Sequence, residues 1–128
     1  WHAAWERPPD ILVIHVGGND VGKLMNKALI NSIVQDLGVW QEQFPNTHMA
    51  WSTIIPRRTW EGESDQRRMN HTSRGVNWEV AQELLKAGGS VIGHCHINTN
   101  KLDLYRSDGV HLSTSGLDLF LSNLHGGL

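Results

Sequence analysis

The chain has 128 residues, which is enough for one compact domain with its own core and too few for two. Its 39% hydrophobic and 19% charged residues exclude a disordered chain, and a net charge of -2 argues against a surface that binds polyanions throughout. Cys95 is the only cysteine, so an internal disulfide is excluded as well.

The same features bear on location. No apolar run approaches the roughly 18 residues of a membrane span, and no signal-peptide pattern stands before the fold. With the single cysteine, this favours a cytoplasmic or nuclear protein in a reducing compartment. The chain begins at Trp1 rather than Met, and a strand pattern begins by Ile11. We therefore expect a fragment whose upstream part is absent.

The first predicted elements are a connector and a buried strand. Residues Trp1 to Asp10 include Pro8-Pro9 and show no period, which is typical of a connector. Ile11 to Val16 is an unbroken apolar run rich in β-branched residues, which predicts a strand covered on both faces. Gly17-Gly18 then predicts a turn that presents Asn19 and Asp20 at the strand's carboxyl end. In parallel sheets, ligands bind at that end.

Strands and helices alternate along the rest of the chain. Apolar residues at helical spacing predict a helix with Leu29, Ile33, Leu37, Trp40 and Phe44 on its buried face, which ends before Pro45. The patterns that follow predict a strand over 48–55, a helix over 65–86, a strand over 90–94 and a last helix capped by Ser113 or Thr114. This order indicates a three-layer α/β/α sandwich with a parallel, flavodoxin-like sheet.

Two readings compete for the loop at Gly17. Gly17, Gly22 and Lys23 have the spacing of a P-loop between a strand and a helix, which would make the chain a P-loop-like nucleotide binder. However, position 24 is Leu, so the hydroxyl that would hold Mg²⁺ is missing. Nucleotide binding is therefore the distant alternative.

The second reading depends on a loop near the end of the chain. Asp108 lies three residues before His111, just ahead of the last predicted helix. This spacing allows the carboxylate to accept a hydrogen bond from one ring nitrogen and to leave the other nitrogen free as a base. Gly109 allows the tight turn between them. Alone, the pattern is more typical of a surface Asp that caps a loop beside a solvated His.

Together, the two blocks resemble those of the SGNH hydrolase superfamily, the GDSL-type esterases and lipases. Gly17-Gly18-Asn19-Asp20 is similar to the block whose Asn donates to the oxyanion, and Asp108 to His111 is similar to the block that carries the triad Asp and His. The resemblance implies that residues 1–128 form an SGNH-type esterase domain that cleaves small-molecule or lipid-like esters. It implies Asp108 and His111 as catalytic residues, Asn19 as oxyanion donor, Gly17, Gly18 and Asp20 as loop support, and no cofactor or metal.

The family's Gly-Asp-Ser block and the block with an oxyanion-hole Gly do not occur in residues 1–10. We therefore expect the nucleophile upstream of Trp1, together with a first strand and helix that this chain lacks. Ser52 and Ser107 lie at the wrong place in the chain order. The alternative is a catalytically inactive SGNH-like remnant or binding module, and similar domains occur in some retrotransposon open reading frames.

Two other clusters invite functional readings. The sequence His94, Cys95, His96 is compatible with a metal site. The more common reading is two polar histidines at the end of a strand beside a small buried Cys. Five arginines interleave with Trp60 and Trp78, as in single-stranded nucleic-acid binders: Arg57, Arg58, Arg67, Arg68 and Arg74. Glu61, Glu63 and Asp65 dilute that patch, so the composition argues against nucleic acid.

Overall fold

The computed structural model describes residues 7–128. Its three strands, β1 (Ile11–Ile14), β2 (His48–Ser52) and β3 (Ser90–Ile92), form a parallel sheet in the order β1-β2-β3. Of the predicted Trp1 to Asp10 connector, residues 1–6 lie outside the described part of the chain.

Each strand is shorter than its apolar run predicted. β1 ends at Ile14 rather than Val16, β2 at Ser52 rather than residue 55, and β3 at Ile92 rather than His94. The reason is that the paired registers stop at Ile14 opposite Trp51 and at Ser52 opposite Ile92. Beyond these pairs the sheet ends. Four residues that were expected in strands line a cavity there instead: His15, Val16, Ile54 and Ile55.

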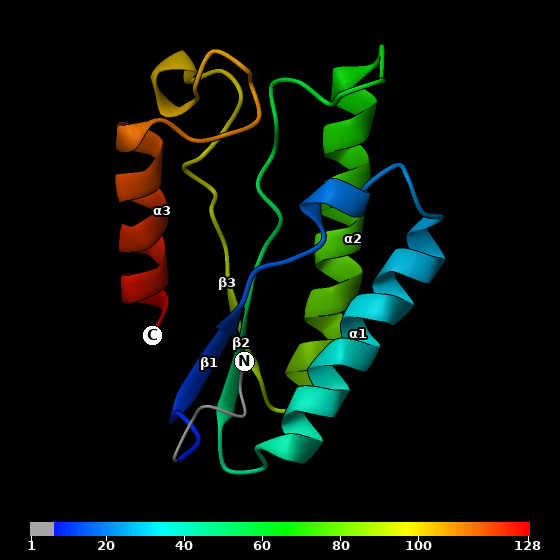
Figure 1. Ribbon diagram of the computed structural model, residues 1–128, viewed down its shortest axis with the longest axis vertical. Helices are drawn as coiled ribbons and strands as arrows, with labels where there is room; N and C mark the ends of the chain where they lie inside the picture. Colours follow the sequence, from blue (N-terminus) through cyan, green and yellow to red (C-terminus); the bar gives the residue numbers. More distant parts are fainter. Residues whose placement is uncertain (1–6) are drawn as a thin grey trace.

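Three helices cover the two faces of the sheet. α1 (Asn26–Gln43) and α2 (Gln66–Lys86) pack together on one face, and α3 (Thr114–Gly127) lies on the other (Figure 1). The predicted cap of α3 is in place, since Ser113 Oγ accepts from Gly116 N at 3.1 Å. At the start of α2, the Asp65 carboxylate accepts from Arg68 N at 3.0 Å. The predicted three-layer α/β arrangement is therefore confirmed.

The main core lies between the sheet and the α1–α2 pair. Met49 and Trp51 point into it from β2, while Ser52, on the alternate face, is turned toward α3. The helices contribute the stripes that their periodicity predicted: Leu29, Ile33 and Leu37 from α1, and Met69, Val76, Val80 and Leu84 from α2. Burial of this continuous apolar surface fixes both helices on the sheet.

A second, smaller core holds the carboxyl-terminal loops. Ile97, Leu104 and Tyr105 are buried there against Leu112 and Phe120, beside the short 3-10 helix η3 (Leu102–Leu104). The Tyr105 hydroxyl donates to the Pro56 carbonyl at 2.6 Å, which ties this region to the segment after β2. No helix within residues 7–128 is long and apolar enough to cross a membrane.

Candidate active site at the carboxyl ends of the strands

Asn19 is held in a tight turn directly after β1. Gly17 has a φ of 103°, which favours glycine, and residues Gly18–Asp20 form the 3-10 helix η2. The Asp20 N–H donates back to the Gly17 carbonyl at 3.1 Å, while the Asp20 carbonyl accepts from Lys23 and Leu24. The backbone of Gly17, Gly18 and Asp20 thus supports the turn that presents the Asn19 side chain.

Asp108 and His111 form a hydrogen-bonded pair in the loop before α3. One carboxylate oxygen, Oδ2, lies 2.6 Å from His111 Nδ1, and Oδ1 accepts from the backbone N–H groups of Val110 at 2.9 Å and His111 at 3.0 Å. Because a carboxylate only accepts, Nδ1 must carry the proton. Within the described residues no group bonds to Nε2. The imidazole is 71% exposed, so Nε2 is available as a base.

The same contacts keep Asp108 ionised. The hydrogen bond from His111, and next the backbone N–H groups of Val110 and His111, hold the pKa of the Asp108 carboxyl well below its usual range. Gly109, with a φ of 71°, makes the turn, and its carbonyl accepts from Arg58 N at 2.8 Å and Thr59 N at 3.0 Å. The loop is therefore attached to the segment that follows β2.

Residues that are far apart in the sequence line one cavity. It has a volume of about 620 Å³, and Asn19, Arg57, His111 and Phe120 lie on its wall. A neighbouring cavity of about 490 Å³ shares Asn19 and His111 and adds Asp108. Residues 92 positions apart in the sequence thus share one cleft, as the two motifs predicted.

The larger cavity offers no hydroxyl or thiol among the described residues. Its wall includes no Ser, Thr or Cys, and Thr59 is the hydroxyl residue of the smaller cavity. Ser107 lines neither, and Ser52 is fully buried. Among the described residues the two cavities therefore bring together an imidazole, its carboxylate partner and a side-chain amide, and neither wall includes a serine.

Ser52 belongs instead to a series of polar side-chain contacts that includes His15, His94 and Asn123. Its Oγ lies 2.8 Å from His94 Nε2 and 3.0 Å from His15 Nδ1, and His94 Nδ1 lies 3.1 Å from the Asn123 amide nitrogen. His94 is buried and stacks on Phe120 with ring centroids 4.7 Å apart. His15, predicted to be a core residue in a strand, is hydrogen-bonded but exposed, because β1 ends before it.

This arrangement predicts a pH-dependent loss of stability. Burial, followed by the nearby His15, lowers the pKa of His94 to about 4. Between pH 6.5 and pH 5 the unfolded chain takes up protons that the folded chain rejects, so the free energy of unfolding should fall by about 1.5 kcal/mol as the pH falls. Urea titrations at the two pH values measure this slope.

Two variants separate His94 from the other histidines. His94→Gln should flatten the slope, whereas His125→Gln, at an exposed site on α3, should leave it unchanged. A slope that persists in His94→Gln would show that another group causes it.

The other candidate motifs are not assembled into sites. Cys95 is exposed rather than buried, and residues 7–128 contain no group of three His, Cys, Asp or Glu side chains that could hold a metal ion.

In the P-loop reading, a helix should begin at Lys23, but α1 begins only at Asn26. The loop also folds back on its own carbonyls, since Lys23 N donates to Asp20 O at 3.1 Å.

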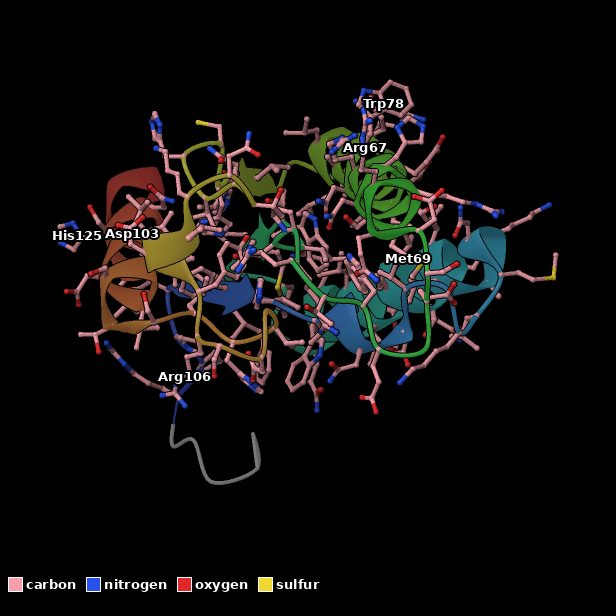
Figure 2. The ribbon with its side chains drawn as sticks, turned by 90° about the horizontal axis from the view of Figure 1, so that it is seen from above. Arg67, Met69, Trp78, Asp103, Arg106 and His125 are labelled. Carbon is pink, nitrogen blue, oxygen red and sulfur yellow. The ribbon has the colours of Figure 1, made fainter. Side chains whose placement is uncertain are left out.

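The arginine cluster is divided between two surfaces. Arg57 lies on the cavity wall, with its guanidinium 4.7 Å from the centre of the Trp60 ring. Arg67 and Trp78, in contrast, project from the outer side of α2, away from the sheet (Figure 2). The five arginines therefore do not form the single patch that their sequence positions suggested.

Sequence reasoning missed two asparagines that shape the site. Asn70 and Asn77 lie seven residues apart on α2. Asn77 pairs with both backbone polar groups of Ile54, at 2.7 and 2.9 Å, and Asn70 does the same with Arg57, at 2.9 and 2.8 Å. Amide side chains at i and i+7 on a mostly apolar helix face were the available signal. They fix the irregular segment between β2 and α2.

Solved structures that this chain resembles include two carbohydrate esterases and a GDSL-like lipase. A family 3 carbohydrate esterase from Talaromyces cellulolyticus matches with a TM-score of 0.72 and 20% identity over 92% of this chain and 56% of its own. A GDSL-like lipase from Bacteroides thetaiotaomicron matches with a TM-score of 0.73 and 15% identity, over 92% of this chain and 61% of its own. A family 3 carbohydrate esterase from Clostridium thermocellum matches with a TM-score of 0.67 and 18% identity, over 93% of this chain and 55% of its own.

These matches are structural. No protein-family model and no curated protein sequence matches the chain. The chain spans between 55% and 61% of the length of the structures that it resembles. Over that length it has the α/β fold of the SGNH hydrolases, the fold to which its two sequence blocks pointed.

Proposed function

We propose that this chain is part of an SGNH-type serine ester hydrolase domain and supplies its base, its orienting carboxylate and one oxyanion donor. The observation that carries the proposal is the common cavity of Asn19 and His111, with Asp108 2.6 Å from the imidazole. Residues 1–128 are then one portion of that domain. The substrate is a small-molecule or lipid-like ester, because the cavity of about 620 Å³ has an apolar wall formed by residues such as Ile54, Leu117 and Phe120.

The proposed chemistry follows from the free nitrogen of His111. A serine hydroxyl placed in the cavity attacks the ester carbonyl carbon while Nε2 of His111 takes its proton. Asp108, held ionised, keeps the proton on Nδ1 and stabilises the imidazolium. The Asn19 amide donates to the carbonyl oxygen as it becomes negative. His111 then returns the proton to the leaving alkoxide, and water hydrolyses the acyl-enzyme by the same steps.

The place for the nucleophile is the open edge of the sheet. β1 pairs only with β2 among the described strands, and Ile11 at that edge is exposed. A further parallel strand beside β1 would end next to Gly17–Asp20, since parallel strands bring their carboxyl ends to one side. Leu117 of α3, which lines the cavity, is 48% exposed. A strand from upstream of Trp1 that ends in Ser would complete the site.

We expect the 128-residue chain by itself to show no serine-dependent turnover. Because no serine of residues 7–128 lines the larger cavity, p-nitrophenyl acetate should give no burst of nitrophenol, and a fluorophosphonate should label no serine. Stopped-flow absorbance and mass spectrometry of the treated protein measure the two results. A burst that a serine-directed phosphonate abolishes would contradict this prediction.

A longer protein that carries such a strand upstream of Trp1 would test the function itself. There a fluorophosphonate should label one serine, His111→Ala should lower kcat by about 10⁴-fold or more, and Asn19→Ala by roughly 10²- to 10³-fold. His125→Ala, at an exposed site on α3, is the matched control and should leave kcat unchanged. A folded longer protein without labelling would favour the inactive binding module.

A further inference from the structure

We propose that Arg57 is a positioning residue that fixes the orientation of the Asn19 amide. Arg57 Nη2 donates to Asn19 Oδ1 at 2.8 Å. A guanidinium has donors and no acceptor, so the Asn19 atom that faces it must be the oxygen. The Nδ2 group then points the other way, and no described residue accepts a hydrogen bond from it. The side chain lies on the cavity wall with its donor unused, which is the state an oxyanion donor requires.

Arg57 is itself held from two sides. Its guanidinium stacks on Trp60, which is 3% exposed, and Trp60 Nε1 donates to Asn70 Oδ1 at 2.9 Å. The same Asn70 oxygen accepts from Arg57 N, and Asn70 Nδ2 donates to Arg57 O at 2.8 Å. A continuous series of contacts thus runs from α2 through Trp60 and Arg57 to Asn19. Each member is fixed by the previous one, which is how a donor is held in place before a reaction.

The charge of Arg57 reinforces this arrangement. No carboxylate of the described residues lies within ion-pair distance of it. Partial burial lowers the pKa of Arg57, but a guanidinium remains charged at neutral pH. Hydrogen bonding from a cation to Oδ1 polarises the amide and strengthens Nδ2–H as a donor. A Cβ at position 18 would lie 3.1 Å from Arg57 Nη2, so Gly18 also leaves room for the guanidinium.

The catalytic part of this inference rests on the proposed function, whereas the orientation of Asn19 can be measured in the chain alone. In a ¹³C,¹⁵N-labelled sample, the Asn19 Cγ resonance should lie downfield because its oxygen accepts from a cation. Arg57→Gln should move it upfield, since Gln can accept as well as donate and no longer fixes the amide. Arg57→Lys, which keeps charge and donor, should retain most of the shift, and Arg58→Gln, at an exposed site off the cavity wall, should retain all of it. An Asn19 resonance unchanged in a folded Arg57→Gln protein would overturn the proposal.

A double-mutant cycle in the longer protein tests the consequence for catalysis. Arg57→Gln should lower kcat about tenfold with little change in KM, and it should have no further effect in the Asn19→Ala background. An equal loss in both backgrounds would overturn the proposal, because Arg57 would then act independently of Asn19. If the longer protein shows no turnover, the proposed function fails, while the Asn19 resonance still decides whether Arg57 orients the amide.

Discussion

Gly116→Ala is expected to lower the free energy of unfolding by roughly 3 kcal/mol. Gly116 is buried in the first turn of α3, and a Cβ there would overlap the carbonyl oxygen of Leu104 and lie 3.1 Å from the Leu112 side chain. That carbonyl also accepts from Ser113 N at 2.9 Å, so η3 and the start of α3 are in direct contact. Because the obstacle is backbone rather than a flexible side chain, the helix must move away.

The loop that carries His111 should move with the helix. Ser113, two residues after His111, caps α3, and its hydroxyl also donates to the Asp103 carbonyl at 2.5 Å. Urea unfolding measures the stability, and the His111 ring resonances report on the loop. Gly38→Ala is the matched control: nothing lies within 4 Å of a Cβ there, so Ala should stabilise α1 by up to about 1 kcal/mol. Equal effects of the two substitutions would contradict the packing argument.

Asn70→Ala is also expected to lower the free energy of unfolding by about 3 kcal/mol, but for a different reason. The side chain is buried and makes three hydrogen bonds, to Trp60 Nε1 and to the backbone N–H and carbonyl of Arg57. Truncation leaves these groups without partners in a site that is largely closed to water. The cost of unpaired buried polar groups exceeds the modest net value of the bonds themselves.

Asn70→Ala should also release Arg57 from its place beside Asn19. Urea unfolding gives the energy, and the Asn19 Cγ resonance gives the orientation. Asn31→Ala, on the exposed face of α1, is the control and should stay within about 0.5 kcal/mol of the parent chain. A stable Asn70→Ala protein with an unchanged Asn19 resonance would contradict both parts of the prediction.

The outer faces of the structure suggest how the upstream segment would be accommodated. Leu117 and Leu121 of α3 and Ile11 of β1 are exposed apolar residues, and β1 is an edge strand among the described strands. A further strand and helix of the proposed domain would cover them. The proposal thus explains exposed leucines that a surface helix would ordinarily bury.

The sequence by itself determined the order of helices and strands and the two motifs, Gly17 to Asp20 and Asp108 to His111. The apolar periods located the buried stripes of α1 and α2, and Ser113 caps α3 as its side-chain chemistry predicted. Asp108 and His111 were readable as a pair because three residues separate them in a turn with Gly109. These features depend on neighbours within about one helical turn, so local sequence is sufficient to predict them.

The tertiary structure decided what depends on segments distant in the sequence. The strands end early because pairing across the sheet stops, which no single strand encodes. The contact of Arg57 with Asn19 spans 38 residues and exists only because Asn70 and Trp60 fix an irregular segment beside the first turn. The sequence gives no signal for such a contact, because only the packing of the folded chain determines which of the five arginines lies beside Asn19.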